Sequence, residues 1–304
     1  MDQPQHPPVG DVAGVTASAA RSAGIDLHTH STASDGTLSP ADLVAAGGQA
    51  GLDVLAITDH DTTAGWEPAA AARPAGLTLV RGAELSCRWH GATASVSLHL
   101  LAYLFDPAEP ALVAELARIR TAREVRGERI VRRLRDDGVP ISWDEVRGYA
   151  AGGTIGRPHI AQALIRAGLV STTDEAFAPQ WLGQRYRLGK EDIDVFTAVR
   201  LVRAAGGVPV FAHPRASRRG AVVPDSMIVE LAAAGLFGLE IDHEDHSPAE
   251  RAQLRQLAAD LDLVITGSSD FHGTHKTVQL GAWTTAPEAY ERIVGAAHGV
   301  PPIP

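Results

Sequence analysis

Histidines and carboxylates recur along this chain, each at a point where an apolar run meets a polar loop. His28 and His30 form one pair, and Asp270 and His272 form a second pair with the same spacing. Side chains of an extended strand alternate between its two faces, so the members of each pair point the same way and can bind one cation. One such pair is a weak signal, but two pairs at predicted strand ends favour a metal site.

Single residues extend this series. His60, Glu84 and His213 each follow an apolar run that is typical of a buried strand. We therefore expect all three at the carboxyl end of a strand, where an unpaired buried charge is costly and a shared cation offsets that cost. With Asp35 from a Ser-Asp-Gly turn, the candidate metal ligands are His28, His30, Asp35, His60, Glu84, His99, His213, Asp270 and His272. Imidazole and carboxylate ligands together suit manganese, iron or zinc and do not select among them.

Taken together, these motifs resemble those of the PHP (polymerase and histidinol phosphatase) family of metal-dependent phosphoesterases. The matching stretches run from about Ile25 to the end of the chain. Within the family the chain is most similar to small bacterial enzymes that act on nucleotides, namely 3′,5′-nucleoside bisphosphate phosphatases and a related 5′-to-3′ exoribonuclease. That closer similarity is carried by Gly156-Arg157-Pro158-His159 and Gly238-Leu239-Glu240-Ile241-Asp242-His243.

The resemblance implies a cluster of two or three divalent metal ions. The ligands that it implies are, for the first ion, His28, His30, Glu84 and Asp270; for the second, Glu84 as a bridge with His99 and His213; and for the third, Asp35, His60 and His272. Manganese is expected on family grounds, with zinc or iron as alternatives. The implied activity is hydrolysis of phosphate monoesters of nucleotides, either 3′,5′-bisphosphates or monophosphates, by metal-activated water.

Arg157 and His159 begin a predicted helix at residues 158–167. The free amides and the dipole of a first helical turn favour an anion, and an arginine there can hold a phosphate with two parallel hydrogen bonds. Alternatively, Arg157 pairs with an acid of the rim and His159 caps the helix. The matching motif in the resembling enzymes faces the substrate, so we expect both residues to bind it, with Arg157 fixing a phosphate during catalysis.

His243 follows another predicted strand end, and the resembling enzymes also have a histidine near the phosphate at this place. We expect His243 or His213 to protonate the leaving group. Asp242 departs from the uncharged residue expected beside it, which leaves the choice of substrate open. Earlier in the chain, Arg185 and Lys190 could contact a second phosphate or a base, or could belong to a basic hinge.

The elements that must position these residues alternate between strand-like and helix-like segments. Ser39 and Ser247 are each followed directly by proline and, three residues after the serine, by an acid, a pattern typical of a capped helix start. Such alternation, with candidate ligands at strand ends, indicates an α/β barrel with its active site at the carboxyl-terminal rim. The resemblance implies a distorted seven-stranded (β/α) barrel.

The alternation is interrupted between about residues 108 and 190, where apolar residues recur at helical spacing. We interpret residues 108–190 as a helical insertion domain over the barrel mouth, with residues 25–107 and 191–304 forming the barrel. The segment at residues 118–135 carries eight arginines against two glutamates. It could attract phosphates, or its charges could face solvent as pairs spaced by four residues.

Composition limits the remaining choices. The chain has 304 residues, 45% of them hydrophobic, and a formal net charge of −9, which argues against a general nucleic-acid coat protein. Bound metal ions would nevertheless make the site attractive to an anionic substrate. The single cysteine, Cys87, excludes an internal disulfide framework and is expected to be a small buried residue in a reducing compartment.

Residues 1–24, which include His6, are predicted to be a disordered tail because they are rich in proline, alanine, glycine and serine. They contain no signal peptide or membrane segment, so we expect a cytoplasmic protein with no membrane and no obligate protein partner. Its partner would be a nucleotide, another small phosphorylated substrate or short RNA. Two alternatives stay open: a 5′-to-3′ exoribonuclease acting on short RNA, and a metal-binding module without catalysis.

Overall fold

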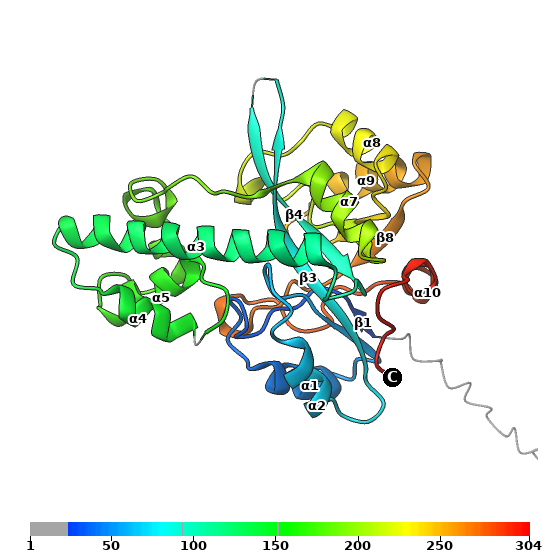
Figure 1. Cartoon of the computed structure of the whole chain (residues 1–304), viewed down its shortest axis with the longest axis horizontal. Coiled ribbons are helices and arrows are strands. Elements are labelled where there is room, and N and C mark those ends of the chain that lie inside the picture. Colours follow the sequence, from blue (N-terminus) through cyan, green and yellow to red (C-terminus); the bar gives the residue numbers. More distant parts are fainter. Residues whose placement is uncertain (1–23, 93, 151) are drawn as a thin grey trace, which may run out of the picture.

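A strongly curved sheet forms the centre of the molecule (Figure 1). The computed structural model describes residues 24–304 apart from residues 93 and 151. Within this part of the chain, seven strands follow one another in the order β1 (Ile25–Asp26), β2 (Val54–Ile57), β3 (Thr78–His90), β4 (Ser95–Tyr103), β6 (Val208–Phe211), β7 (Gly238–Asp242) and β8 (Val264–Gly267), and β5 (Ile193–Asp194) pairs with β3. A parallel bridge between Thr29 and Phe271 brings the two edges together. The sheet therefore nearly closes into the predicted α/β barrel.

β3 and β4 are the strands that distort the barrel. β4 runs antiparallel to both of its neighbours, whereas the other successive strands on the path pair in parallel. The prediction that Glu84 ends a strand is wrong, because β3 continues to His90 and Glu84 pairs with Leu101 in the middle of a long hairpin. The physical reason is that Leu85 and Cys87, both buried, alternate with polar residues, so the strand keeps an apolar face beyond Glu84.

The interior of the barrel is a packed apolar core. One buried cluster joins side chains from six of its strands, among them Ile25, Ala56, Val80, Leu101, Val210 and Val264. Helix α10 (Pro287–Ala296) adds Ile293 to the same cluster. Because the interior is filled, the rim of loops at the strand ends is the part of the barrel that can hold a site.

Helices cover the outer face of the sheet (Figure 1). They are α1 (Pro40–Gln49), α2 (Trp66–Ala72), α7 (Val195–Ala204), α8 (Asp225–Ala233) and α9 (Pro248–Asp260). The two predicted capped starts are confirmed: the Ser39 hydroxyl accepts from the Asp42 N–H at 3.1 Å, and the Ser247 hydroxyl accepts from the Glu250 N–H at 3.3 Å. Each cap satisfies an amide that the first helical turn leaves without a partner.

Residues 108–190 are mainly helical, as predicted, and they are dominated by one long helix (Figure 1). The elements are α3 (Pro110–Asp136), α4 (Trp143–Ala150), α5 (Arg157–Arg166), α6 (Thr173–Ala176) and the π-helical turn η1 (Pro179–Gly183). Leu112 and Leu116 in the first half of α3 pack into the core shared with the barrel, whereas Ile130 and Leu134 in its second half belong to a separate core with α4 and α5. One helix thus connects two hydrophobic cores, and the division of the chain into two domains stays a prediction.

The predicted tail at residues 1–24, with His6, lies outside the described residues apart from Gly24. Among the helices that the structure describes, none combines the length and the apolar composition needed to cross a bilayer. Cys87 is buried in β3, in agreement with its predicted role as a small core residue.

Candidate active site

The candidate ligands converge on the carboxyl-terminal side of the barrel. His28 and His30 follow β1, His60 follows β2, and Asp270 follows β8. The carboxyl ends of parallel strands meet at one rim, and this geometry brings residues that are far apart in sequence together. The Nε2 atoms of His28 and His30 lie 3.1 Å apart, as the two-residue period of an extended chain requires.

Glu84 lies at the centre of this cluster and is almost fully buried. Because β3 runs past the rim, its carboxylate reaches five imidazoles from four different segments. Its Oε2 atom lies 3.1 Å from His28 Nε2, 3.1 Å from His30 Nε2 and 3.2 Å from His60 Nδ1, and its Oε1 atom lies 2.7 Å from His99 Nδ1 and 3.1 Å from His213 Nε2. A carboxylate with both oxygens surrounded in this way can bridge two cations.

Three groups of ligand atoms are compact enough to hold a metal ion. Their members are His28, His30, Glu84 and Asp270; His30, Asp35, His60 and His272; and His60, Glu84 and His99, with the atoms of each group within 4.8 Å of one another. The first group is the set that the family resemblance implied for the first ion. His213 lies outside the three groups, although it contacts Glu84. The structure therefore brings all nine candidate ligands to one rim.

Unsatisfied polar atoms indicate that these groups fit cations. His60 Nδ1 and His99 Nδ1 lie 3.2 and 2.7 Å from the oxygens of Glu84, yet neither nitrogen is aligned for a hydrogen bond. Asp35 Oδ1 is buried among imidazoles and also has no hydrogen-bond partner. Buried polar atoms without hydrogen bonds are rare. Imidazole nitrogens and carboxylate oxygens that lie close together but are not aligned for a hydrogen bond are expected where these atoms are ligands of a shared cation. The residues present thus fit divalent metal ions.

Burial and neighbouring charges shift the pKa values of the candidate ligands. Burial alone would raise the pKa of the Glu84 carboxyl, but the surrounding imidazoles, with His99 first, hold that pKa well below its usual range. Burial lowers the pKa of His272 to about 4, and the nearby His30 and Lys276 act in the same direction. A metal ligand must be an ionised carboxylate or a neutral imidazole, and the shifts at Glu84 and His272 favour these forms. Burial would lower the pKa of His28 and His30, but the neighbouring carboxylates raise the pKa of His28 well above its usual value and that of His30 to about 9, so a cation that binds there displaces protons.

Asp59 and Asp61, on either side of His60, hold the surrounding loops rather than joining the ligand groups. Asp59 accepts hydrogen bonds from the Ser31 N–H at 2.8 Å and the Ser34 hydroxyl at 2.7 Å. Asp61 accepts from the Ser86 N–H at 2.7 Å, and its other oxygen lies 2.7 Å from Arg123 Nε on α3. The two acids therefore fix the loops that carry His30 and His60, which keeps the ligands in position.

His243 and His246 differ in what their rings contact. His243 is buried, and its Nε2 lies 3.3 Å from Asp270 Oδ2, so the ring faces the ligand cluster. The ring of His246 has both nitrogens occupied by backbone groups, because Nε2 accepts from the Arg215 N–H at 3.0 Å and Nδ1 donates to the Ile241 carbonyl at 2.8 Å. His246 thus fixes a loop, and His243 is the histidine that is available to the site.

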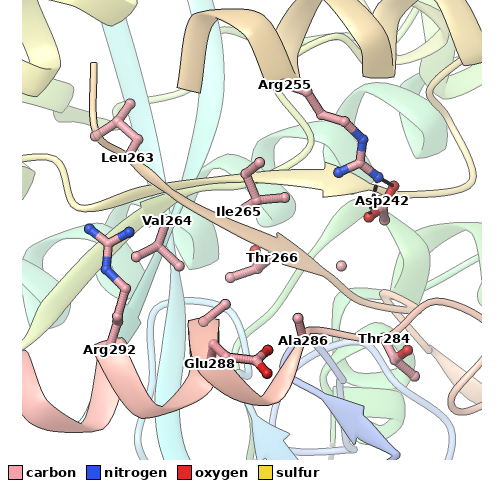
Figure 2. Close-up of a pocket in the computed structure, with 12 residues that line it drawn as sticks. Asp242, Arg255, Leu263, Val264, Ile265, Thr266, Thr284, Ala286, Glu288 and Arg292 are labelled. Carbon is pink, nitrogen blue, oxygen red and sulfur yellow. Dashed lines mark hydrogen bonds and ion pairs between the residues drawn. The ribbon is translucent and has the colours of Figure 1, made fainter. Parts of the chain in front are cut away.

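Asp242 points away from the ligand cluster. A β-bulge between Glu240 and Asp242 reverses the usual alternation, so that the Asp242 carboxylate lies 2.5 Å from Arg255 Nη2 on α9. Figure 2 shows this pair at the edge of a cleft between β8, α9 and α10, which contains none of the candidate ligands. The charge on Asp242 therefore does not face the site, although the sequence left that open.

Arg157 and His159 lie at the start of α5 and have different environments. Arg157 donates to the Leu182 carbonyl at 3.2 Å, stacks on the Phe177 ring at 5.0 Å and forms no ion pair with a described carboxylate. His159 is buried, and its Nδ1 accepts from the Gly156 N–H at 3.0 Å, so it caps its own helix. The structure thus shows the capping role that was the alternative for His159 and leaves the Arg157 guanidinium without an acid.

A group of cations surrounds Arg157. Arg126 on α3 is 8% exposed, and its Nε atom has no hydrogen-bond partner. Burial, together with the positive charges of Arg123 and Arg157, lowers the pKa of Arg126 to about 10, although Asp192 and Asp61 act in the opposite direction. Burial likewise lowers the pKa of the half-buried Lys190 to about 8, with the same arginines contributing. Arg126, Arg157 and Lys190, which we call the cationic group, are thus each influenced by the positive charge of neighbouring arginines, and Asp192 offsets part of that charge at Arg126 and Lys190.

The remaining arginines of α3 divide between two faces. Arg118 pairs with Glu115 and Arg132 pairs with Glu128, both on the exposed side, in the way a solvated helix does. Arg126 lies on the buried side. Arg185, also predicted to bind substrate, forms an exposed ion pair with Asp137 at 2.8 Å and does not join the cationic group. The arginine-rich segment thus has one solvated face and one face toward the site.

Sequence reasoning missed two residues that contact the ligands. Glu240 Oε1 lies 2.9 Å from His28 Nδ1, and a glutamate in the middle of the apolar run of β7 was a signal that could have found it. Lys276 Nζ lies 2.6 Å from Asp270 Oδ2 and 3.1 Å from the Asp270 carbonyl. No pattern marked this lysine, because it follows the 3-10 turn η3 (Gly273–His275), whose path depends on tertiary contacts.

Lys276→Met is expected to lower kcat/KM by about 10-fold to 100-fold. The Lys276 ammonium holds Asp270 Oδ2, while Asp270 Oδ1 lies 3.4 Å from the Nε2 atoms of His28 and His30. A hydrogen bond between charged groups contributes about 1.5–3 kcal/mol, and its loss frees the carboxylate to rotate. Steady-state hydrolysis of a phosphate ester measures the effect, and Lys276→Arg should retain most of the activity. A Met variant with unchanged kcat/KM would show that Asp270 needs no such restraint.

Comparison with known proteins identifies the family. Residues 26–117 match the PHP domain. The chain is 35% identical over 259 residues to the 5′-3′ exoribonuclease of Haemophilus influenzae, which covers 84% of this chain and 92% of that protein. It is 31% identical over 284 residues to the 3′,5′-nucleoside bisphosphate phosphatase of Chromobacterium violaceum, which covers 92% of this chain and 94% of that protein.

A solved structure agrees with these relatives. A Bifidobacterium adolescentis protein assigned as a metal-dependent phosphoesterase superimposes with a TM-score of 0.84 at 36% identity, covering 91% of this chain and 97% of that one. The similarity therefore extends over the barrel and the helical segment together. With its rim of buried histidines and carboxylates, the chain belongs to the PHP family and is a metal-dependent phosphoesterase.

Proposed function

We propose that this enzyme is a nucleotide phosphatase that removes one phosphate from a nucleotide carrying two, such as a 3′,5′-nucleoside bisphosphate. The observation that carries the proposal is the cationic group, in which Asp61 and Asp192 offset only part of the positive charge and Arg126 Nε has no hydrogen-bond partner. A buried charge without a full set of partners is costly, and a phosphate would supply hydrogen bonds to buried Arg126 and to the half-buried Arg157 and Lys190. The bisphosphate phosphatase among the relatives supports the same substrate class.

The ligand cluster is the proposed place of hydrolysis. We infer that His28, His30, Glu84 and Asp270 hold one divalent ion and that the remaining candidate ligands hold one or two more. Bound there, the ions would activate water and neutralise charge that develops on the phosphoryl group. Manganese is the proposed metal, with zinc and iron as alternatives that the same ligand types accept.

His243 is the proposed acid for the leaving group. The water oxygen forms a bond to phosphorus as the ester P–O bond breaks, and His243 in its imidazolium form passes the Nε2 proton to the departing alkoxide, while the proton that the attacking water loses restores the imidazolium. His213 is less suited to this role, since its Nε2 lies 3.1 Å from Glu84 and is directed toward the ligand cluster. His243 Nε2 instead lies 3.3 Å from Asp270 Oδ2, and its ring lies 5.3 Å from the His213 ring.

The cationic group is proposed to hold the phosphate that is not hydrolysed. Arg157 and Lys190 supply charge, and the amides at the start of α5 add donors that favour an anion. Arg126 adds a guanidinium from α3. We give His159 a supporting role, because its cap fixes the start of α5, and we place Arg185 at the margin of the site.

A second candidate function is exonucleolytic cleavage of short RNA from its 5′ end. It is favoured by the exoribonuclease relative, and the same cations could hold a phosphodiester group. A metal-binding module without catalysis is less consistent with a complete set of ligands.

For either enzyme the proposed location is the cytoplasm, and the proposed partners are small phosphorylated substrates with no obligate protein subunit.

Phosphate release from three substrates tests the proposal. The manganese-loaded protein should release inorganic phosphate from a 3′,5′-nucleoside bisphosphate much faster than from a 5′-monophosphate, with no mononucleotides from short 5′-phosphorylated RNA. Asp270→Asn should abolish the release. Stepwise mononucleotides from the RNA would favour the exoribonuclease, and no turnover of any of the three substrates would refute both candidates.

Arg126→Met is expected to raise KM for the bisphosphate by about 10-fold to 100-fold, since a charge-assisted hydrogen bond contributes about 1.5–3 kcal/mol. Hydrolysis of p-nitrophenyl phosphate, which has one phosphate, should be unchanged. Arg129→Met is a matched control, because Arg129 is on the same helix and exposed. Equal losses on both substrates would mean that Arg126 serves the fold and not a second phosphate.

A further inference from the structure

Glu240 is a charged residue in the centre of a buried strand. It lies in β7 between Leu239 and Ile241, and all three side chains are fully buried. A buried carboxylate is costly unless hydrogen bonds or charges offset the loss of water. Its contacts therefore indicate why the strand carries a glutamate at this position.

Each oxygen of Glu240 has a different partner. Oε1 lies 2.9 Å from His28 Nδ1, and Oε2 accepts from the backbone N–H of His213 at 2.9 Å. The two partners come from separate parts of the rim, since His28 follows β1 and His213 follows β6. One carboxylate thus fixes two histidines that approach the cluster from different strands.

The contact with His28 determines which ring nitrogen is available to a metal. When Nδ1 carries the proton and donates it to Glu240, the lone pair is on Nε2. That Nε2 atom lies 3.1 Å from Glu84 Oε2 and 3.4 Å from Asp270 Oδ1. Glu240 therefore holds His28 in the tautomer and orientation that its ligand group requires.

The contact with His213 fixes an unusual backbone. His213 has a φ of +32°, in the left-handed region that a residue with a side chain seldom adopts. The hydrogen bond from its N–H to Glu240 holds the peptide in this conformation. As a result the ring of His213 is directed back to the cluster, with Nε2 3.1 Å from Glu84 Oε1.

We propose that Glu240 is the positioning residue that organises both His28 and His213 for metal binding. The proposal rests on the proposed metal cluster but not on the identity of the substrate. The bulge after Glu240 is what allows this role, because it keeps Glu240 inside while Asp242, two residues later, pairs with Arg255 outside. The same strand therefore carries one inward and one outward acid, which provides a matched pair of variants.

The test is a calorimetric titration of metal-stripped protein with Mn²⁺. Glu240→Gln should weaken the tightest binding by about 10-fold to 100-fold, the usual effect of removing a carboxylate that orients a ligand. Asp242→Asn should bind Mn²⁺ like the wild type. In steady-state assays Glu240→Gln should lower kcat and leave KM unchanged, because the residue does not touch the substrate.

Folding is checked separately by the melting temperature of the metal-free variants. If Glu240→Gln does not fold, Glu240→Asp keeps the charge but draws the carboxylate back, and the same loss of Mn²⁺ affinity is expected. Wild-type affinity in either folded variant would overturn the proposal, as would a wild-type protein that binds no divalent ion. Tight Mn²⁺ binding by the wild type without hydrolysis of any phosphate ester would refute the proposed function, while the effect of Glu240→Gln on affinity would still support this inference.

Discussion

Glu84→Gln is expected to reduce kcat on the preferred phosphate ester by at least about 10³-fold, equivalent to about 4 kcal/mol of activation free energy. The carboxylate lies within 3.2 Å of five imidazole nitrogens and belongs to two of the three ligand groups. An amide keeps the shape but removes the negative charge that a bridging ligand supplies. Rate measurements at saturating Mn²⁺, with metal content determined by mass spectrometry, test this expectation.

Glu288→Gln is a suitable control for the Glu84 variant. Glu288 is an exposed carboxylate on α10, in the cleft of Figure 2, and it belongs to none of the ligand groups. Its replacement should leave both metal content and kcat unchanged. A Glu84→Gln variant that retains its metal and more than about a tenth of the wild-type rate would contradict the assignment of Glu84 as a bridge.

Removing the metal with a chelator should lower the melting temperature by on the order of 10 °C and abolish activity. A ligand at 1,000 times its Kd stabilises the folded state by about 4 kcal/mol, and for a protein of this size each kcal/mol corresponds to about 2–4 °C. Without cations, the buried carboxylates and imidazoles of the rim lack full compensation of their charges. Differential scanning calorimetry before and after chelation measures the shift.

Restoring the metal distinguishes loss of the bound ion from irreversible damage to the protein during chelation. Addition of Mn²⁺ should restore both the melting temperature and the activity, and Glu84→Gln should show little change in melting temperature with either treatment. Equal melting temperatures for metal-free and metal-loaded wild type, at saturating Mn²⁺, would mean that the rim does not bind the ion in the folded state.

The positions of the candidate ligands were largely predictable, because they depend on local rules. The pair of His28 and His30 follows from the two-residue period of an extended chain, and Asp270 and His272 follow from the same rule. Glu84 was found as a candidate but placed at a strand end, since nothing local distinguishes a strand that ends from one that continues as a hairpin. The type of residue was therefore easier to predict than its place in the element.

What the sequence did not reveal depends on tertiary packing. The exposed ion pairs of α3 follow from spacing, but the burial of Arg126 depends on which face the helix turns to α4 and α5. The outward direction of Asp242 depends on a bulge, and a bulge has no strong sequence signal in so short a strand. The contact of Lys276 with Asp270 depends on the path of a loop.

The long helix has one further consequence. α3 runs unbroken from the barrel core to the second core; Arg123 on it pairs with Asp61 beside His60, and Arg126 lies about one turn farther along. Under the proposed function, helix α3 then fixes the distance between the ester bond that is cleaved and the phosphate that is retained. Selectivity would arise from the distance between the two phosphates of the substrate. The enzyme would then accept a nucleotide with any base, provided that its two phosphates are that far apart.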